Sequence, residues 1–304
     1  MKLTESNKHS IAGAGAGLVA SVITCPLDVV KTRLQNQGVE KPGIKYYRGT
    51  YSSLKRIWFE EGIRGLYRGL GPTIMGYLPT WAIYFTAYDS FKNYSSLILG
   101  ILIIILTVAF LNEIVDKPKS SSMVHIFGAM SAGALCTIST SPLWVIKTRI
   151  MTQSNTTDYR YNGTLDAFKS ILRIEGIKGF YKGLMPSLLG VSHVAVQFPL
   201  YEHLKLLATM NNEKVKTSSL LLSSGIAKLV ASCLTYPHEV IRTRLQNQTK
   251  KPYKYNGVIN TIKIIGKEEG YRGYYKGLTT NLIRTIPASV LTIFTYELII
   301  LKIT

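Results

Sequence analysis

Long, weakly charged stretches alternate with charged connectors along the chain, and this alternation predicts a membrane protein. The stretches are long enough to cross a bilayer as helices, and they lie at residues 11–36, 71–92, 122–151, 184–205, 218–246 and 278–302. Each odd-numbered stretch is followed by a connector with a shorter amphipathic segment, such as residues 52–61. We therefore expect an all-α fold of six transmembrane helices, with both termini on the same side of the membrane.

Two sequence motifs occur three times each, in the same order. The first ends the odd-numbered helices and combines a proline with one mostly acidic and two basic positions, at Pro26–Arg33, Pro142–Arg149 and Pro237–Arg244. The second lies in the connectors and runs from a Glu-Gly pair to an aromatic-basic-Gly triplet, at Glu61–Gly69, Glu175–Gly183 and Glu269–Gly277. Self-similarity at a long period indicates a repeat architecture. We predict three repeats, at residues 1–121, 122–217 and 218–304.

The first repeat is longer than the others because it contains an additional apolar segment at residues 97–115. Its most apolar part, residues 97–111, would rise only about 22 Å as a helix, which is short of a hydrocarbon core of about 30 Å. A seventh crossing would also invert every later span relative to the first repeat. We therefore expect an interfacial or helix-extending insertion, with a seventh span as the alternative.

Composition argues against several other functions. Lysine and arginine number 36 against 17 aspartates and glutamates, which gives a formal net charge of +19. A basic excess also suits nucleic acids, but the basic stretches lie beside the spans and resemble no nucleic-acid module, so we expect no nucleic-acid partner. Cys25, Cys136 and Cys233 fall in apolar segments and indicate neither a disulfide nor a metal site. The sequence contains no nucleophile–base set, so we expect no enzyme and no bound cofactor.

Hydroxyl side chains form a stripe along each odd-numbered helix. Steps of four and seven residues back from the acidic position of the first motif stay on one helical face, and they reach Thr24, Ser21, Thr140, Thr137, Thr235 and Ser232. Polar groups at membrane depth normally face a bundle interior, so this face should line a central cavity. The alternative is that each hydroxyl bonds its own helix backbone, which the recurrence in three repeats disfavours.

The even-numbered helices differ from one another at the level where all three should face the same cavity. A threefold scaffold loses its symmetry where it contacts an asymmetric small molecule, so we assign to a ligand Gly76, Thr80, His193, Gln197 and Arg284. Lys228 joins this set because it replaces a glycine of the other repeats. Neither Arg284 nor Lys228 has an obvious acidic partner at its level. Two unpaired cations in a cavity predict an anionic ligand.

These repeated motifs resemble those of the mitochondrial carrier family, as do the aromatic-acidic pairs that close the even helices at residues 88–89, 201–202 and 296–297. The resemblance covers nearly the whole chain and implies a six-helix barrel with pseudo-threefold symmetry, three short matrix-side helices and two ionic gates that open alternately. It places the matrix gate at Asp28, Lys31, Gln35, Trp144, Lys147, Glu239, Arg242 and Gln246, the two glutamines acting as braces. It places the cytosolic-side gate at Asp89, Lys92, Glu202, Lys205 and Glu297. The Tyr-x-Gly and Tyr-basic-Gly turns resemble the cardiolipin-binding helix ends of the family.

Two positions depart from the family pattern. Trp144 stands where the other repeats have an acidic residue, and this leaves Arg242 without its gate partner. Ile300 stands at the position of the last helix where the other repeats have a basic residue, and this leaves Glu202 without its gate partner. Each gate should therefore hold two interhelical ion pairs instead of three. Because desolvation makes the net value of such pairs uncertain in sign, easier gate opening is a hypothesis.

The segment Pro142–Arg149 resembles the branch of the family that carries NAD, pyrimidine nucleotides, flavin and folate, and residues 76–85, 192–199 and 279–288 resemble its NAD carriers. This implies a monomeric, multi-pass protein of the mitochondrial inner membrane that imports NAD by alternating access, in exchange for an adenine or other nucleotide. Arg284 and Lys228 would then hold the phosphates. Tyr77 and Trp81 would stack on a ring, and Gly190 would leave room for the base. A pyrimidine nucleotide carrier, or a FAD or folate carrier, is the alternative.

Overall fold

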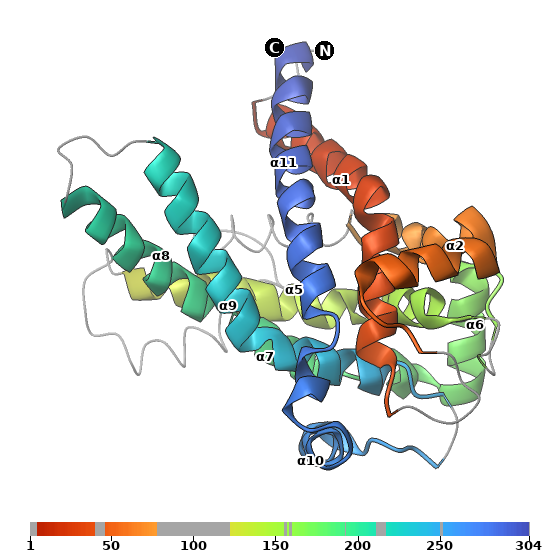
Figure 1. Cartoon of the computed structure of the whole chain (residues 1–304). Coiled ribbons are helices and arrows are strands. Elements are labelled where there is room, and N and C mark those ends of the chain that lie inside the picture. Colours follow the sequence, from red (N-terminus) through yellow and green to blue (C-terminus); the bar gives the residue numbers. More distant parts are fainter. Residues whose placement is uncertain are drawn as a thin grey trace, which may run out of the picture. The chain divides into compact units, whose positions relative to one another are not determined.

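The computed structural model describes residues 5–39, 46–77, 122–154, 157, 160–191, 193–210, 217–249 and 252–303, and every regular element in these ranges is a helix (Figure 1). The longest helices are α1 (Glu5–Asn36), α5 (Ser122–Thr152), α9 (Thr217–Gln246) and α11 (Leu278–Ile303). The shorter ones are α2 (Thr50–Leu66), α6 (Thr164–Glu175), α7 (Leu184–Val191), α8 (His193–Met210) and α10 (Gly257–Glu269). Two 3-10 turns are η1 (Ile177–Tyr181) and η2 (Tyr271–Tyr275). The expected second span is described as a helix up to Tyr77, and the insertion at residues 97–115 lies outside the described residues.

Each repeat buries a pair of apolar residues just after the proline of its first motif. In the second repeat Val145 and Ile146 of α5 pack with Ile171 of α6, and all three are at most 1% exposed. The first and third repeats form equivalent clusters of α1 with Ile57 of α2 and of α9 with Ile265 of α10. Burying one such side chain contributes about 1.5–3 kcal/mol. The amphipathic segment of each connector is therefore a helix that packs against the end of its own odd helix.

A glycine with positive φ ends α6 and α10 and kinks α2 at the equivalent position. Gly176 follows α6 with φ 68°, and Gly62 and Gly270 both have φ 65° in the other two repeats. Residues with a Cβ atom rarely adopt this conformation, whereas glycine adopts it without steric cost. The Glu-Gly pair of the second motif thus places the glutamate directly before a break in the regular helix.

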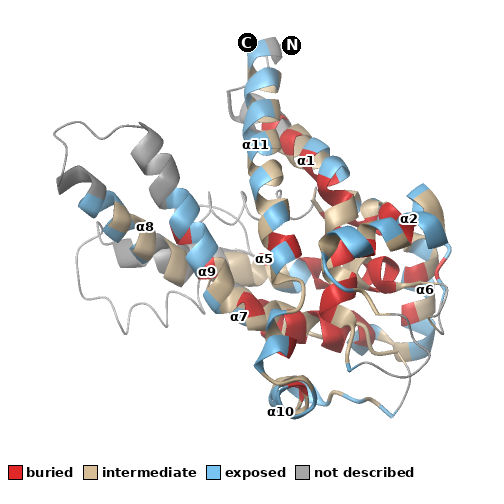
Figure 2. Cartoon of the chain, viewed as in Figure 1, coloured by how far each residue is buried: buried red, intermediate tan, exposed pale blue. Residues whose placement is uncertain are grey.

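The structure divides into two compact units, which are described separately. Unit 1 contains residues 1–78, 140–187 and 236–304, and unit 2 contains residues 79–139 and 188–235. In unit 1, α1 and α11 lie side by side (Figure 1), and a Cβ atom added to Gly15 would be only 2.6 Å from Cδ1 of Ile299. This glycine therefore allows the close helix approach that small residues provide in membranes. Figure 2 shows that buried residues of unit 1 gather along α1 and around α2 and α6.

Two stretches of the described chain qualify as membrane spans by length and hydropathy. They are Ala12–Asn36 and Tyr271–Leu301, with mean hydropathies of 1.6 and 1.4. Large apolar side chains of α11, among them Ile286, Val290 and Phe294, are exposed. An exposed apolar face of this kind suits contact with lipid rather than water.

Candidate functional site

The last arginine of each first motif binds the glutamate of the second motif in the same repeat. These pairs are Arg33–Glu61, Arg149–Glu175 and Arg244–Glu269. Arg149 is fully buried and donates from Nη1 and Nη2 to the two carboxylate oxygens of Glu175, at 2.5 and 2.9 Å. Two parallel charge-assisted hydrogen bonds fix both the distance and the direction of the partners. Each odd helix is thus tied to its own amphipathic helix.

The same three arginines also bind the end of the next repeat's odd helix. Arg33 donates from Nε to the carbonyl of Met151 in α5 at 3.0 Å. The equivalent bonds run from Arg149 to the carbonyl of Gln246 in α9 at 2.9 Å and from Arg244 to the carbonyl of Gln35 in α1 at 3.1 Å. Carbonyls at a helix C-terminus lack intrahelical donors and form the negative end of the helix dipole. The repeats are therefore linked first to second, second to third and third to first. We call the three Arg–Glu pairs, together with these three links to backbone carbonyls, the arginine ring.

The basic residue of each aromatic-basic-Gly triplet completes the arginine ring. Lys182 lies 2.6 Å from Glu175 and donates to the carbonyl of Gln248 at 2.7 Å, and Arg68 and Lys276 occupy the same place in the other repeats. Burial would raise the pKa of Glu175, but hydrogen bonds from Arg149 and Lys182 outweigh it and hold this pKa below its usual value. The pKa of Glu269 is lowered by the same balance.

A second level of ion pairs joins the odd helices one turn earlier along each first motif. Lys31 of α1 binds Glu239 of α9 at 2.6 Å, and Lys147 of α5 lies 3.8 Å from Asp28 of α1. Gln35 donates to Glu239 at 3.2 Å, which is the brace position that the sequence resemblance implied. We call this level the gate network, formed by Asp28, Lys31, Trp144, Lys147, Glu239 and Arg242.

The second repeat differs from the others in the gate network. Trp144 donates from Nε1 to Oγ1 of Thr140 at 3.0 Å, and Nζ of Lys147 lies 4.9 Å from the centre of its ring. The ring of Tyr77 meets that of Trp144 edge-on, at 6.3 Å between centroids and 86°. Within the described residues, the side chain of Arg242 has no hydrogen bond or ion pair. These residues hold two interhelical ion pairs between the odd helices, the number expected from the sequence.

The second brace, Gln246, has different surroundings from the first. Its Oε1 accepts a hydrogen bond from Oγ1 of Thr148 at 2.8 Å. Its carbonyl belongs to the arginine ring through Arg149. The ion pair that a brace would support is replaced here by Trp144, so Gln246 joins α9 to α5 through a neutral hydrogen bond.

Arg284 of α11 reaches the gate network from an even-numbered helix. Its Nη1 lies 2.8 Å from Oδ1 of Asp28, so Asp28 faces Arg284 with one oxygen and Lys147 with the other. The expectation that Arg284 has no acidic partner is therefore wrong. The expectation failed because counting residues along one helix cannot show that Arg284 of α11 lies level with Asp28 of α1. The guanidinium is incompletely satisfied, since its Nε is buried without a hydrogen-bond partner among the described residues.

The other residues assigned to a ligand are divided between the units. In unit 1, a Cβ atom added to Gly76 would be 3.8 Å from Leu143, so this glycine lies against α5. In unit 2, Nδ1 of His193 is 3.1 Å from Oγ1 of Thr235. Lys228 is exposed, and its side chain has no ion pair or hydrogen bond in the part of the chain that the structure describes. Unit 2 also contains Gly190 and Gln197.

Several predicted residues keep only their sequence-based assignment. Thr80, Trp81, Asp89 and Lys92 lie outside the described residues. Glu202 and Lys205 belong to unit 2, whereas Glu297 belongs to unit 1. Their placement in a ligand site or in the cytosolic-side gate stays a prediction.

The hydroxyl stripe bonds largely to its own helices. Thr24 donates to the carbonyl of Ala20 at 2.8 Å, and Ser21, Thr137 and Thr235 likewise donate to the carbonyl four residues earlier. We expected these hydroxyls not to bond the backbone of their own helix, and for these four side chains that expectation is wrong. In apolar surroundings a short hydroxyl gains most from the nearest carbonyl, which is that of the preceding turn.

Sequence analysis also missed a glutamine that follows each first motif by four residues. The side-chain amide of Gln153 accepts from the backbone N–H of Tyr161 at 3.0 Å and donates to its carbonyl at 3.2 Å. Gln37 and Gln248 hold the equivalent tyrosines in the same way. These bonds fix the Tyr-x-Gly turns. The threefold recurrence of the glutamine was the available signal.

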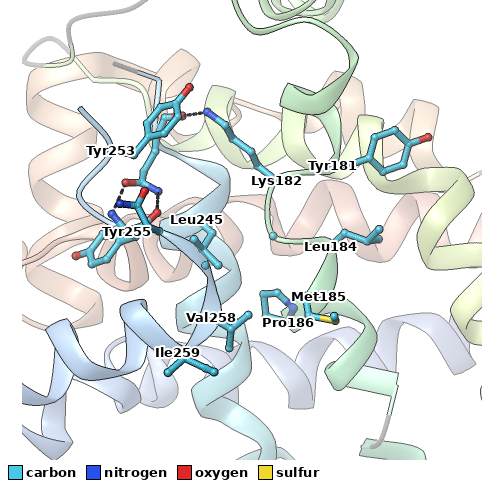
Figure 3. A pocket seen from close by; sticks show the side chains of 14 residues that line it. Tyr181, Lys182, Leu184, Met185, Pro186, Leu245, Tyr253, Tyr255, Val258 and Ile259 are labelled. Atoms are coloured by element: carbon cyan, nitrogen blue, oxygen red, sulfur yellow. Dashed lines mark hydrogen bonds between the residues drawn. The ribbon is translucent and has the colours of Figure 1, made fainter. Parts of the chain in front are cut away.

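A cavity of about 700 Å³ lies in unit 1 between the Tyr181–Gly183 turn and the Tyr255–Gly257 turn. Figure 3 shows Tyr253 and Tyr255 on one side of it and Tyr181 with Leu184 on the other, with Lys182 between them. The helices α7 and α10 begin at these two turns. The cavity thus combines apolar walls with one cation and two helix N-termini, where unsatisfied N–H groups favour anions.

Three linked repeats, apolar spans and an interior ion-pair network define a membrane carrier. The sequence profile of the family described as "Mitochondrial carrier protein" matches residues 4–97, 118–212 and 213–303, and the chain belongs to this family. The match falls in three consecutive segments, and together with the helices of the described residues it confirms the predicted all-α fold class built from three repeats. Membership of a carrier family identifies the protein as a membrane transporter.

Individual relatives carry more specific names. The chain is 43% identical over 299 residues to "Nicotinamide adenine dinucleotide transporter 1, chloroplastic" of Arabidopsis thaliana, which covers 96% of this chain and 90% of the relative. It is 41% identical over 307 residues to "Mitochondrial nicotinamide adenine dinucleotide transporter 1" of Saccharomyces cerevisiae, covering 97% and 77%. It is 34% identical to human "Solute carrier family 25 member 33", covering 96% and 94%.

Proposed function

We propose that this protein exchanges NAD across the mitochondrial inner membrane. Relatives named as NAD transporters, similar over nearly the whole chain, support this substrate. The observation that carries the proposal is Arg284, a cation on an even helix that is held by Asp28 of the gate network and still has a buried, unpartnered Nε. A planar guanidinium of this kind suits phosphate oxygens.

Transport would proceed by alternating access. With the Lys31–Glu239 and Lys147–Asp28 pairs formed, the odd helices are held together at this level. NAD entering from the opposite side would contact Arg284 and compete with Asp28 for it. Weakening the Asp28 contacts would then favour separation of the odd helices, so that the energy of substrate binding drives gate opening.

Exchange in liposomes tests this proposal. Purified protein is reconstituted into vesicles loaded with NAD, ADP or a pyrimidine nucleotide, and uptake of labelled NAD, UTP and FAD is measured. We expect NAD uptake that depends on internal nucleotide. Exchange of UTP without NAD would instead support a pyrimidine nucleotide carrier, and no exchange of any of the three would refute nucleotide transport.

We further propose that the cavity beside Lys182 binds the headgroup of cardiolipin and that the carrier works as a monomer. The support is the combination of apolar walls with the N-termini of α7 and α10. Lys182 is also engaged by Glu175, so a lipid phosphate would depend mainly on backbone N–H groups. Thermal unfolding in detergent with added cardiolipin tests the lipid site. We expect cardiolipin to raise the unfolding temperature, whereas phosphatidylcholine should not. A bulky substitution at Pro186 should reduce the rise caused by cardiolipin.

Light scattering tests whether the carrier is a monomer, and it should give one chain per detergent micelle.

A further inference from the structure

The gate network contains more positive than negative charge. Among the described residues, its cations Lys31, Lys147 and Arg242, together with Arg284 of α11, face only two carboxylates, those of Asp28 and Glu239. Lys147 is in electrostatic range of both arginines. Uncompensated charge at membrane depth is costly, so this arrangement favours the entry of an anion with two negative charges.

Arg242 is the clearest uncompensated group. Glu239, one turn away on the same helix, is the carboxylate that acts on Arg242 electrostatically, but it already binds Lys31 at 2.6 Å and Gln35 at 3.2 Å. On the neighbouring helix α5, the motif position that holds an acid in the other repeats is Trp144, which cannot accept an ion pair. Trp144 therefore has a second effect besides the loss of a gate contact: it leaves the guanidinium of Arg242 available to bind an anion.

Arg284 is the second available group. Only one edge of its guanidinium is used, through Nη1 and Asp28, and its buried Nε has no partner in the described part of the chain. A phosphate oxygen could satisfy Nε and compete for Nη1, which is the two-pronged geometry that arginine prefers.

We propose that Arg242 and Arg284 together form a diphosphate subsite within the gate network, and that Trp144 creates it by leaving Arg242 unpaired. The proposal rests on nucleotide transport as the function and assigns the two negative charges of the substrate's diphosphate to these arginines. A gate position would thereby act directly in substrate recognition.

A carboxylate at position 144 provides the test, because it would pair with Arg242 and occupy it. Trp144→Gln is the matched control, since it removes the same ring without adding charge. The purified full-length variants are titrated with inorganic pyrophosphate, and the concentration that gives half of the maximal thermal stabilisation is measured. We expect Trp144→Glu to require at least about tenfold more pyrophosphate than Trp144→Gln. Inorganic phosphate, with a single phosphorus centre, should separate the two variants much less.

Arg242→Gln and Arg242→Lys test the same subsite with Trp144 in place. Arg242→Gln should weaken pyrophosphate binding about as much as Trp144→Glu does. Arg242→Lys, which keeps the positive charge, should weaken it less. Arg173→Gln, on the exposed face of α6, removes an arginine away from the network and should bind as wild type does. Equal pyrophosphate affinity in Trp144→Glu and Trp144→Gln, or in Arg242→Gln and wild type, would overturn the subsite. So would the absence of any pyrophosphate effect on wild type. Because these titrations use neither NAD nor transport, a failure of NAD exchange refutes the proposed function separately.

Discussion

The arginine ring and the gate network lie one turn apart on the same three helices, yet they treat the repeats differently. In the arginine ring every repeat supplies the same arginine, the same glutamate and the same link to the next helix end. In the gate network the first and third repeats supply acids, the second supplies Trp144, and α11 adds Arg284.

This difference separates what holds the protein together from what it recognises. A closed ring of three equivalent links requires the same motif in all three repeats. The ring arginines are buried and already bind their glutamates and carbonyls, so they are not available to a ligand. A small asymmetric molecule needs unequal contacts. The gate network offers them, with one aromatic ring, one shared aspartate and two arginines that are incompletely paired among the described residues.

The largest effect should follow from breaking one link of the arginine ring. Arg149→Ala leaves the buried Glu175 carboxylate without its main partner and removes the link to the end of α9. Removing one member of a buried pair costs about 3–5 kcal/mol. Thermal unfolding in detergent should show a large loss, with Arg173→Gln as the exposed control. A wild-type unfolding temperature would contradict the structural role of the ring.

Reversing a charge in the gate network should affect transport more than stability. Asp28→Lys would place a cation beside both Lys147 and Arg284, so exchange should fall by more than about tenfold. Adding Lys147→Asp should restore part of the rate, because it recreates an opposite pair across α1 and α5. The double variant should not recover fully, since Arg284 still faces a lysine. Initial exchange rates in liposomes check this, and no recovery at all would argue against the pairing.

The smallest expected effect is a pH dependence of the arginine ring. The pKa values of Glu175 and Glu269 are lower in the folded protein than in the unfolded chain. Their pairs therefore contribute fully above the unfolded carboxyl pKa of about 4.3 and lose this contribution as the pH falls further. The unfolding temperature of wild type should fall below that pH more steeply than that of Glu175→Gln. Parallel pH profiles would mean that Glu175 does not titrate with folding.

The repeats were predictable from sequence because period and motif are properties of a single chain. The positions of the helices, the Lys31–Glu239 contact and the isolation of Arg242 all follow from counting along the repeats and from the family resemblance. The Arg284–Asp28 contact was not predictable, because it depends on the relative heights of α1 and α11. The links from each ring arginine to the next odd helix were missed for a similar reason: their acceptors are backbone carbonyls, which no side-chain pattern indicates. The Arg–Glu pairs did have a signal, because both residues recur in all three repeats.

A comparison of two variants by NAD-dependent stabilisation tests the central claim, that the ring holds the fold while the gate network recognises the substrate. Unfolding temperatures of wild type, Arg149→Lys and Arg284→Gln are measured with and without NAD. We predict that Arg149→Lys unfolds at a lower temperature but keeps the shift caused by NAD, whereas Arg284→Gln unfolds near the wild-type temperature and needs at least about tenfold more NAD for the same shift. An unchanged response to NAD in Arg284→Gln, or its loss in a folded Arg149→Lys, would contradict the account.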